Sequence, residues 1–232
     1  MRLAIIPARG GSKRIPRKNI RDFCGKPIIT WSIEAALQSK CFDRVIVSTD
    51  DEEIADVARR FGAEVPFLRP AKLADDYTGT AAVVRHTIEW FEGNGILYEE
   101  VCCIYATAPF IRAEDIQSGL EKLHSSNADY AFTVTSFPFP IQRAVKINTT
   151  GTLEMFYPEY YNSRSQDLEE AFHDAGQFYW GKTSAWKEGI LLFSERAVPI
   201  ILPRYRVQDI DTLEDWIRAE MMFEAIQKEQ MR

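Results

Sequence analysis

Residues 5–19 of this 232-residue chain read IIPARGGSKRIPRKN. The apolar residues at its start continue a short hydrophobic run from Leu3, which predicts a buried β-strand. Gly10 and Gly11 then form a turn in which backbone N–H groups can approach an anion closely. The residues from Arg9 to Asn19, called the basic loop below, include no acid. This order of strand, glycine turn and cationic loop predicts a site for a polyphosphate.

The basic charge is concentrated in this part of the chain. Residues 1–26 hold eight Lys or Arg and one acid, Asp22, which gives a local charge of +7. Since the whole chain carries −6, the remaining residues sum to −13. Proteins that bind long nucleic acids usually spread basic charge over a face or a domain. A small anionic ligand therefore fits better than nucleic acid, and the plain alternative is a solvated basic loop.

Length and composition allow one large α/β domain or one domain with an insertion, because 46% of the 232 residues are hydrophobic. No apolar run approaches the roughly 20 residues that cross a bilayer, and no signal-peptide pattern is present. We therefore expect a cytoplasmic protein with no membrane partner. Four cysteines lack the spacing of a metal site and are expected to be buried or half-buried thiols: Cys24, Cys41, Cys102 and Cys103.

Strands and helices alternate along most of the chain. Strands are predicted at residues 3–6, 44–48, 101–105, 130–135, 177–181 and 197–202, with a short extended piece at 64–67. Helices are predicted at 27–37, 52–61, 78–91, 113–123 and 212–228, the second of them capped by Thr49 and Asp50. This order predicts an α/β fold with a Rossmann-like, mainly parallel sheet and helices on both faces. Such sheets bind ligands at the carboxyl ends of their strands, where the basic loop lies.

The alternation stops between residues 137 and 171. Residues 143–148 and 151–156 predict a β-hairpin, which is followed by a cluster of aromatic residues at 156–161. A hairpin cannot bury both of its faces alone, so it needs either its own core or a second subunit. We therefore expect a nucleotide-binding and catalytic domain of residues 1–136 and 172–232, with an inserted hairpin at 137–171.

A pair of acids, Asp209 and Asp211, precedes the last predicted helix. Carboxylates at i and i+2 of an extended segment project to the same side and can share Mg²⁺. The alternative is that Asp211 or Thr212 only caps the helix, which leaves Asp209 unexplained. The basic loop favours the metal pair, because Mg²⁺ usually binds carboxylates together with substrate phosphates.

These motifs together resemble the sugar-acid cytidylyltransferases, the CMP-sialic acid synthetase family. The matching blocks are residues 6–13 with Pro16, Lys18 and Asn19, then 25–27, 47–50, 65–70 and 209–212. They occur in family order over nearly the whole chain. Residues 13–19, 105–111 and 172–180 depart from the sialate form and resemble the pseudaminic acid cytidylyltransferases.

The resemblance implies a nucleotide-diphospho-sugar transferase-like fold and a transfer of CMP from CTP to a nine-carbon α-keto acid sugar, with release of pyrophosphate. Of these sugars it favours pseudaminic acid. It implies that Arg9, Lys18 and Asp211 are catalytic and that Asp209 and Asp211 hold Mg²⁺. The implied nucleotide-binding residues are Ala8, Arg9, Gly10, Gly11, Ser12, Lys13, Lys18, Asn19, Arg69, Thr80 and Thr107. The implied sugar-binding residues are Arg164, Gln166, Gln177 and Tyr179. It further implies a homodimer formed through residues 137–171.

Several alternatives stay open from the sequence. The sugar could be N-acetylneuraminate or legionaminate, or the substrate could be a phosphorylated sugar or alcohol of a related nucleotidyltransferase. A regulatory protein that only binds nucleotide is the non-enzyme alternative, although such a protein needs no metal pair. His173 is expected to have a structural or sugar-contacting role, because a metal could activate the attacking hydroxyl in its place.

Overall fold

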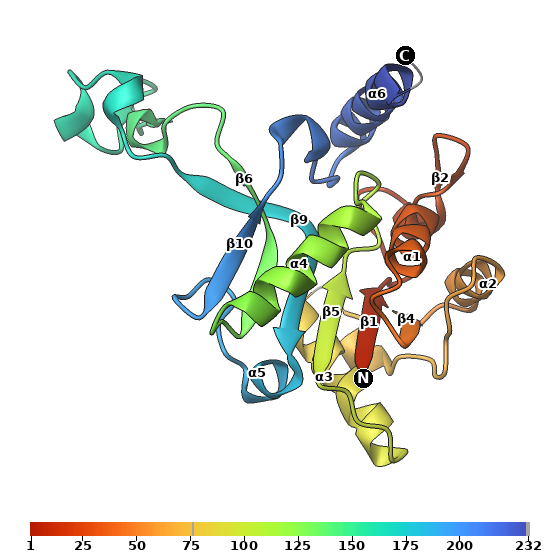
Figure 1. Cartoon of the computed structure of the whole chain (residues 1–232). Coiled ribbons are helices and arrows are strands. Elements are labelled where there is room, and N and C mark those ends of the chain that lie inside the picture. Colours follow the sequence, from red (N-terminus) through yellow and green to blue (C-terminus); the bar gives the residue numbers. More distant parts are fainter. Residues whose placement is uncertain (76, 231–232) are drawn as a thin grey trace.

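The computed structural model describes residues 1–75 and 77–230. Its centre is a six-stranded sheet in the order β10-β6-β9-β5-β1-β4, drawn in Figure 1. The strands are β1 (Arg2–Pro7), β4 (Arg44–Ser48), β5 (Glu100–Ile104), β6 (Tyr130–Ser136), β9 (Phe172–Lys182) and β10 (Ala197–Ile201). All neighbouring pairs are parallel except those of β9, which runs antiparallel to β5 and β6. The predicted mainly parallel sheet is confirmed.

The reversed direction of β9 follows from the insertion that precedes it. The chain leaves the sheet at the carboxyl end of β6, passes through residues 137–171 and returns from the same edge. Pairing of the two strands therefore continues outward as far as Ser136 and Phe172. Figure 1 shows the segment of residues 137–171 standing away from the body of the sheet. The predicted hairpin is present as β7 (Val145–Ile147) and β8 (Leu153–Met155).

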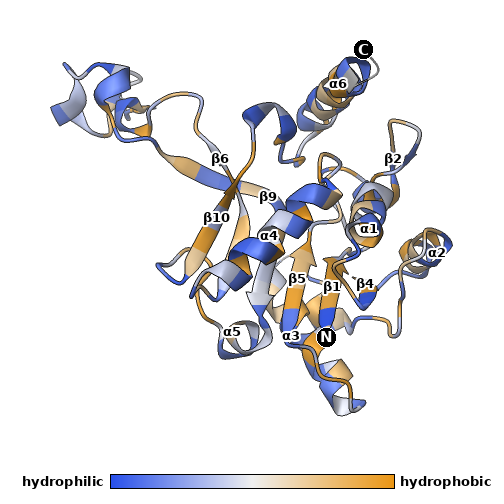
Figure 2. Ribbon diagram, in the orientation of Figure 1, coloured by the Kyte–Doolittle hydropathy of each residue, from blue (hydrophilic) through white to orange (hydrophobic). Residues whose placement is uncertain are grey.

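Helices cover both faces of the sheet, as predicted. α1 (Ile28–Ser39), α2 (Glu52–Arg60) and α4 (Ala113–Ser125) pack on one face, and α3 (Thr80–Gly93) and α5 (Thr183–Glu188) pack on the other. Figure 2 shows the apolar strands enclosed between these two layers. Cys102 belongs to one apolar cluster and Cys103 to the other, because adjacent strand residues face opposite ways. A third cluster forms under α6 (Leu213–Gln230).

Two local predictions need correction. Asp51, rather than Thr49 or Asp50, caps α2, since its carboxylate accepts a hydrogen bond from the backbone N–H of Ile54 at 3.0 Å. The helix predicted from residue 78 begins at Thr80, because the backbone of Gly79 is still extended, with φ −68° and ψ 151°. The short helix α5 was not predicted, since six residues give no clear helical period.

The described part of the chain, residues 1–75 and 77–230, contains no helix that is both long and apolar enough to span a bilayer. In the same ranges no three His, Cys, Asp or Glu side chains gather as a metal site. The four cysteines are free thiols, three buried and Cys24 half-buried, as the sequence predicts.

Candidate active site

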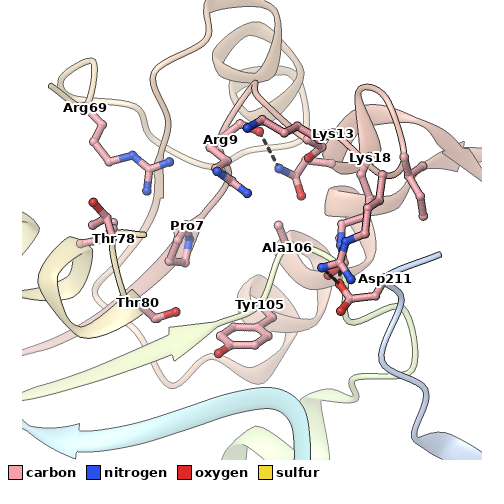
Figure 3. Close-up of a pocket in the computed structure, with 16 residues that line it drawn as sticks. Pro7, Arg9, Lys13, Lys18, Arg69, Thr78, Thr80, Tyr105, Ala106 and Asp211 are labelled. Carbon is pink, nitrogen blue, oxygen red and sulfur yellow. Dashed lines mark hydrogen bonds and ion pairs between the residues drawn. The ribbon is translucent and has the colours of Figure 1, made fainter. Parts of the chain in front are cut away.

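A polar cavity of about 280 Å³ opens at the carboxyl ends of β1 and β5. Parallel strands bring their following loops together at this edge, which is where ligands of such sheets bind. Figure 3 shows Arg9, Lys13 and Lys18 of the basic loop across the cavity from Thr78 and Thr80, which lie at the start of α3. Its lining comprises Pro7, Arg9, Ser12, Lys13, Arg14, Ile15, Lys18, Asn19, Arg69, Thr78, Thr80, Val83, Tyr105, Ala106, Thr107 and Asp211.

The basic loop is held at several points. Ile15 is buried in the apolar cluster under α6 and anchors the loop from below. The Asn19 side-chain amide donates to the backbone carbonyl of Arg9 at 2.9 Å, which closes the loop on itself. The backbone N–H of Gly10 donates to the Asp50 carboxylate at 3.0 Å. These contacts tie the loop to the third apolar cluster and to the residues that follow β4.

Lys18 is a half-buried cation of the cavity that is held by two contacts. Its ammonium donates to the backbone carbonyl of Ile210 at 2.6 Å and lies 3.6 Å from the Asp211 carboxylate. Only 20% of the side chain is exposed. Lys18 therefore links the basic loop to the segment before α6, although the two are almost 200 residues apart in sequence.

Arg69 supplies a second fixed positive charge at the opposite wall. It is 5% exposed, and its guanidinium lies 3.8 Å from the Asp50 carboxylate. Burial is the main cause of a lowered pKa of Arg69, which Asp50 partly offsets. Among the described residues its Nε has no hydrogen-bond partner. A buried cation with an unpaired donor beside a cavity is suited to an anionic or carbonyl ligand.

The side chains of Asp209 and Asp211 do not cap helix α6. The Thr212 hydroxyl accepts from the backbone N–H of Asp215, and the Asp215 carboxylate accepts from the N–H of Thr212 at 2.8 Å. This reciprocal arrangement is a capping box, so α6 does not need the side chain of Asp211. Asp211 instead points into the cavity, where its carboxylate pairs with Arg14 at 3.0 Å. Capping therefore does not account for either Asp209 or Asp211.

Asp209 stands just outside the cavity lining. Desolvation of its carboxyl and the negative charge of Asp211 raise the pKa of Asp209, and the nearby Lys18 opposes this effect. The two carboxylates are thus close enough to repel one another. A hard divalent cation bound between them would relieve the repulsion, and carboxylates with phosphate oxygens are its preferred ligands.

Most of the predicted nucleotide-binding residues line the cavity. The lining includes Arg9, Ser12, Lys13, Lys18, Asn19, Arg69, Thr80 and Thr107. Ala8, Gly10 and Gly11 lie beside it, and Ala8 is buried with its N–H bonded to the carbonyl of Ser48 at 3.0 Å.

The structure does not bring the predicted sugar-binding residues to this cavity. Gln177 is buried and donates to the backbone carbonyl of Arg206 at 2.7 Å, while the Tyr179 hydroxyl donates to the Asp174 carboxylate at 2.6 Å. Arg164 pairs with Asp167 in the inserted segment at 2.7 Å, and Gln166 lines a small hollow in the same segment. His173 contacts the carbonyl of Asp174 at 2.8 Å and the ring of Phe137.

Sequence reasoning missed several residues of the cavity, chiefly Arg14, Thr78 and Tyr105. Arg14 belongs to the basic run but carries no distinguishing pattern. Thr78 and Tyr105 could have been found by position, since one precedes a helix and the other follows β5 at the edge of the sheet where ligands bind.

Comparisons with known proteins identify the family of the chain. The family model described as cytidylyltransferase matches residues 3–183. The pseudaminic acid cytidylyltransferase of Campylobacter jejuni subsp. jejuni serotype O:2 is 48% identical over 221 residues, which cover 95% of each chain. The CMP-N,N'-diacetyllegionaminic acid synthase of Legionella pneumophila is 34% identical and covers 97% of each chain.

Among solved structures, a CMP:2-keto-3-deoxy-manno-octonic acid synthetase complexed with CTP has a similar fold. The TM-score is 0.69, and the match covers 97% of this chain and 98% of the other at 17% identity. At 17% sequence identity this likeness shows the fold alone. The family itself is shown by the family model over residues 3–183 and by the relative with 48% identity. The chain belongs to the cytidylyltransferase family.

Proposed function

We propose that this chain transfers CMP from CTP to the anomeric hydroxyl of pseudaminic acid and releases pyrophosphate. The observation that carries the proposal is the position of Lys18, fixed between the Ile210 carbonyl and Asp211 at the rim of a cationic cavity. The choice of sugar rests on the 48% identity to a pseudaminic acid cytidylyltransferase over 95% of both chains.

In the proposed reaction the sugar hydroxyl attacks the α-phosphorus of CTP, and the bond to the pyrophosphate oxygen breaks. Such transfers depend mainly on positioning and on stabilising negative charge. Arg9, Lys13 and Lys18 line the cavity and would neutralise the triphosphate. Arg69 and Asn19 would hold the nucleoside end. The N–H group of Gly11 would face the phosphates, since that of Gly10 is held by the Asp50 carboxylate.

Asp209 and Asp211 would hold the divalent cation, which we propose is Mg²⁺. When bound, the cation would stabilise charge on the phosphoryl oxygens and lower the pKa of the attacking hydroxyl. In the structure Asp211 is paired with Arg14 and Lys18. Arg14 would therefore turn toward the phosphates when the carboxylate binds metal, while Lys18 would stay held by the Ile210 carbonyl.

We also propose that the segment of residues 137–171 forms a homodimer and carries sugar contacts such as Arg164 and Gln166 to the neighbouring subunit. The segment exposes large apolar side chains that a monomer leaves in water: Phe139 at 79%, Ile147 at 74% and Leu153 at 71%. Its hairpin has only two strands and would gain stability from a partner surface. This arrangement would also explain why Arg164 lies far from the cavity of its own chain.

The dimer is tested by sedimentation velocity. Leu153→Lys should sediment as a monomer, because a charge in the interface lacks a partner. Leu97→Lys is the matched control, since Leu97 is also exposed, at 67%, but lies between α3 and β5. It should remain dimeric. A monomeric wild-type chain, or a dimer that survives Leu153→Lys, would overturn this arrangement.

The choice of sugar is tested with four acids supplied with CTP and Mg²⁺: pseudaminic, N-acetylneuraminic, N,N'-diacetyllegionaminic and 3-deoxy-manno-octulosonic acid. We expect kcat/KM for pseudaminic acid to exceed the others by about 10-fold or more, the range that one differing substituent gives. A higher kcat/KM for another nine-carbon acid would show that the enzyme uses that sugar in place of pseudaminic acid. Release of pyrophosphate with none of them would refute the activity.

A further inference from the structure

The basic loop makes an unusual backbone turn at Arg17. Its φ of 55° and ψ of 29° place it in the left-handed region, which residues other than glycine adopt at a cost. The next residues, Lys18 and Asn19, begin a short 3-10 helix and line the cavity, whereas Arg17 does not. Because of this turn, the side chain of Arg17 points away from the cavity while those of Lys18 and Asn19 line it.

The side chain of Arg17 is bound to the start of α2. Its two terminal nitrogens donate to the two Asp51 carboxylate oxygens at 2.5 and 2.9 Å, and one of them also donates to Glu53 at 2.5 Å. Only 38% of the Arg17 side chain and 22% of the Asp51 side chain are exposed. Forked pairing of this kind is stronger and more directional than an ordinary surface ion pair. The hydrogen bonds from Arg17 also lower the pKa of Asp51, so the carboxylate stays charged.

Asp51 is itself fixed in place. It caps α2 through the N–H of Ile54, and it packs against the first glycine of the basic loop. A Cβ atom on Gly10 would lie 2.6 Å from Asp51 Oδ2 and 3.0 Å from its Cβ. One carboxylate thus contacts both Gly10, where the loop leaves β1, and Arg17, where the loop turns back toward the cavity.

We propose that Arg17 is a positioning residue for the transfer reaction. Its ion pair with Asp51 holds the left-handed turn and thereby directs Lys18 and Asn19 into the cavity. This role rests on the proposed function of the cavity, although Arg17 itself touches neither the cavity nor its ligands.

The first test compares Arg17→Ala, Arg17→Lys and Arg44→Ala. Arg44 is a matched control because it forms the same forked pair, with Glu64 at 3.0 and 2.6 Å, but at the start of β4, away from the carboxyl ends of the strands. Arg17→Ala should lower kcat/KM for CTP by about 30-fold, since a displacement near 1 Å can cost 100-fold. Arg17→Lys keeps the charge without the fork and should fall between Arg17→Ala and wild type. Arg44→Ala should stay within about twofold of wild type, because surface pairs away from the site have small effects.

A double-mutant cycle separates positioning from general destabilisation. If Arg17 acts through Lys18, adding Arg17→Ala to Lys18→Ala should change activity by less than about threefold, because coupled residues are not additive. The proposal would be overturned if the loss of activity in the double variant equalled the product of the losses in the two single variants. It would also be overturned if Arg17→Ala and Arg44→Ala had equal kinetics.

Calorimetric titration with CTP alone tests the role of Arg17 without using the proposed reaction with the sugar. Arg17→Ala should bind CTP at least about tenfold more weakly than Arg44→Ala, with each tenfold change equal to about 1.4 kcal/mol. This comparison holds even if wild type turns over none of the sugars. Equal CTP affinities of the two variants would contradict the positioning role.

Discussion

Asp211→Asn should abolish Mg²⁺-dependent turnover while the fold is retained. The amide has the shape of the carboxylate but cannot supply the charge that pairs with Arg14 and Lys18 and that would bind the cation. We expect kcat to fall by about 1,000-fold, which corresponds to about 4 kcal/mol of barrier. The measurement is pyrophosphate release at saturating CTP and sugar over a range of Mg²⁺ concentrations.

Asp215→Ala is the control for this variant. Asp215 completes the capping box of α6 from the same segment, so its loss should cost about 1 kcal/mol of stability. It should lower Tm by roughly 2–4 °C and leave most of the turnover. Near-normal activity of Asp211→Asn would refute the metal role, and equal loss in both variants would assign the effect to the helix start.

Lys18→Ala should cause the second large loss. The ammonium is held 2.6 Å from the Ile210 carbonyl and 3.6 Å from Asp211, so it is pre-positioned where negative charge would develop on the triphosphate. Removing one such pre-organised group should lower kcat/KM for CTP by about 100- to 1,000-fold. Lys18→Arg should restore only part of this, because the larger planar fork does not occupy the same position as the compact ammonium.

Lys26→Ala is the matched control for Lys18→Ala. Lys26 comes from the same basic segment and is equally exposed, at 20%, but it pairs with Glu34 and lies over the ring of Trp31. Its loss should affect stability and leave turnover within about threefold of wild type. Turnover of Lys18→Ala within the same range would show that Lys18 has no special role.

The cavity could largely be predicted from the sequence, because its parts are local motifs placed by a regular fold. The strand before Gly10 and Gly11, and the alternation after it, place the basic loop at the carboxyl edge of a parallel sheet. The spacing of Asp209 and Asp211 indicates a shared direction, but it cannot decide between capping and the cavity. That decision depends on Asp215, whose hydrogen bonds are visible only in the structure.

Contacts across long sequence distances could not be predicted in the same way. The alternation of Gln177 and Tyr179 suggested a face open to a sugar, but both side chains are buried. Gln177 donates to the carbonyl of the distant Arg206, and Tyr179 donates to Asp174 within β9. The antiparallel direction of β9 likewise depends on where the insertion re-enters the sheet. The ion pair of Arg17 with Asp51 joins two segments whose charges looked unrelated in sequence.

The transfer of labelled phosphorus tests the central claim most directly. With CTP labelled at the α-phosphate, pseudaminic acid and Mg²⁺, the label should appear in a CMP-sugar in equal amount to the pyrophosphate released. Formation of the labelled product should require the sugar and should be lost with Asp211→Asn. Label that stays in CTP, or pyrophosphate released equally without sugar, would contradict the proposed cytidylyl transfer.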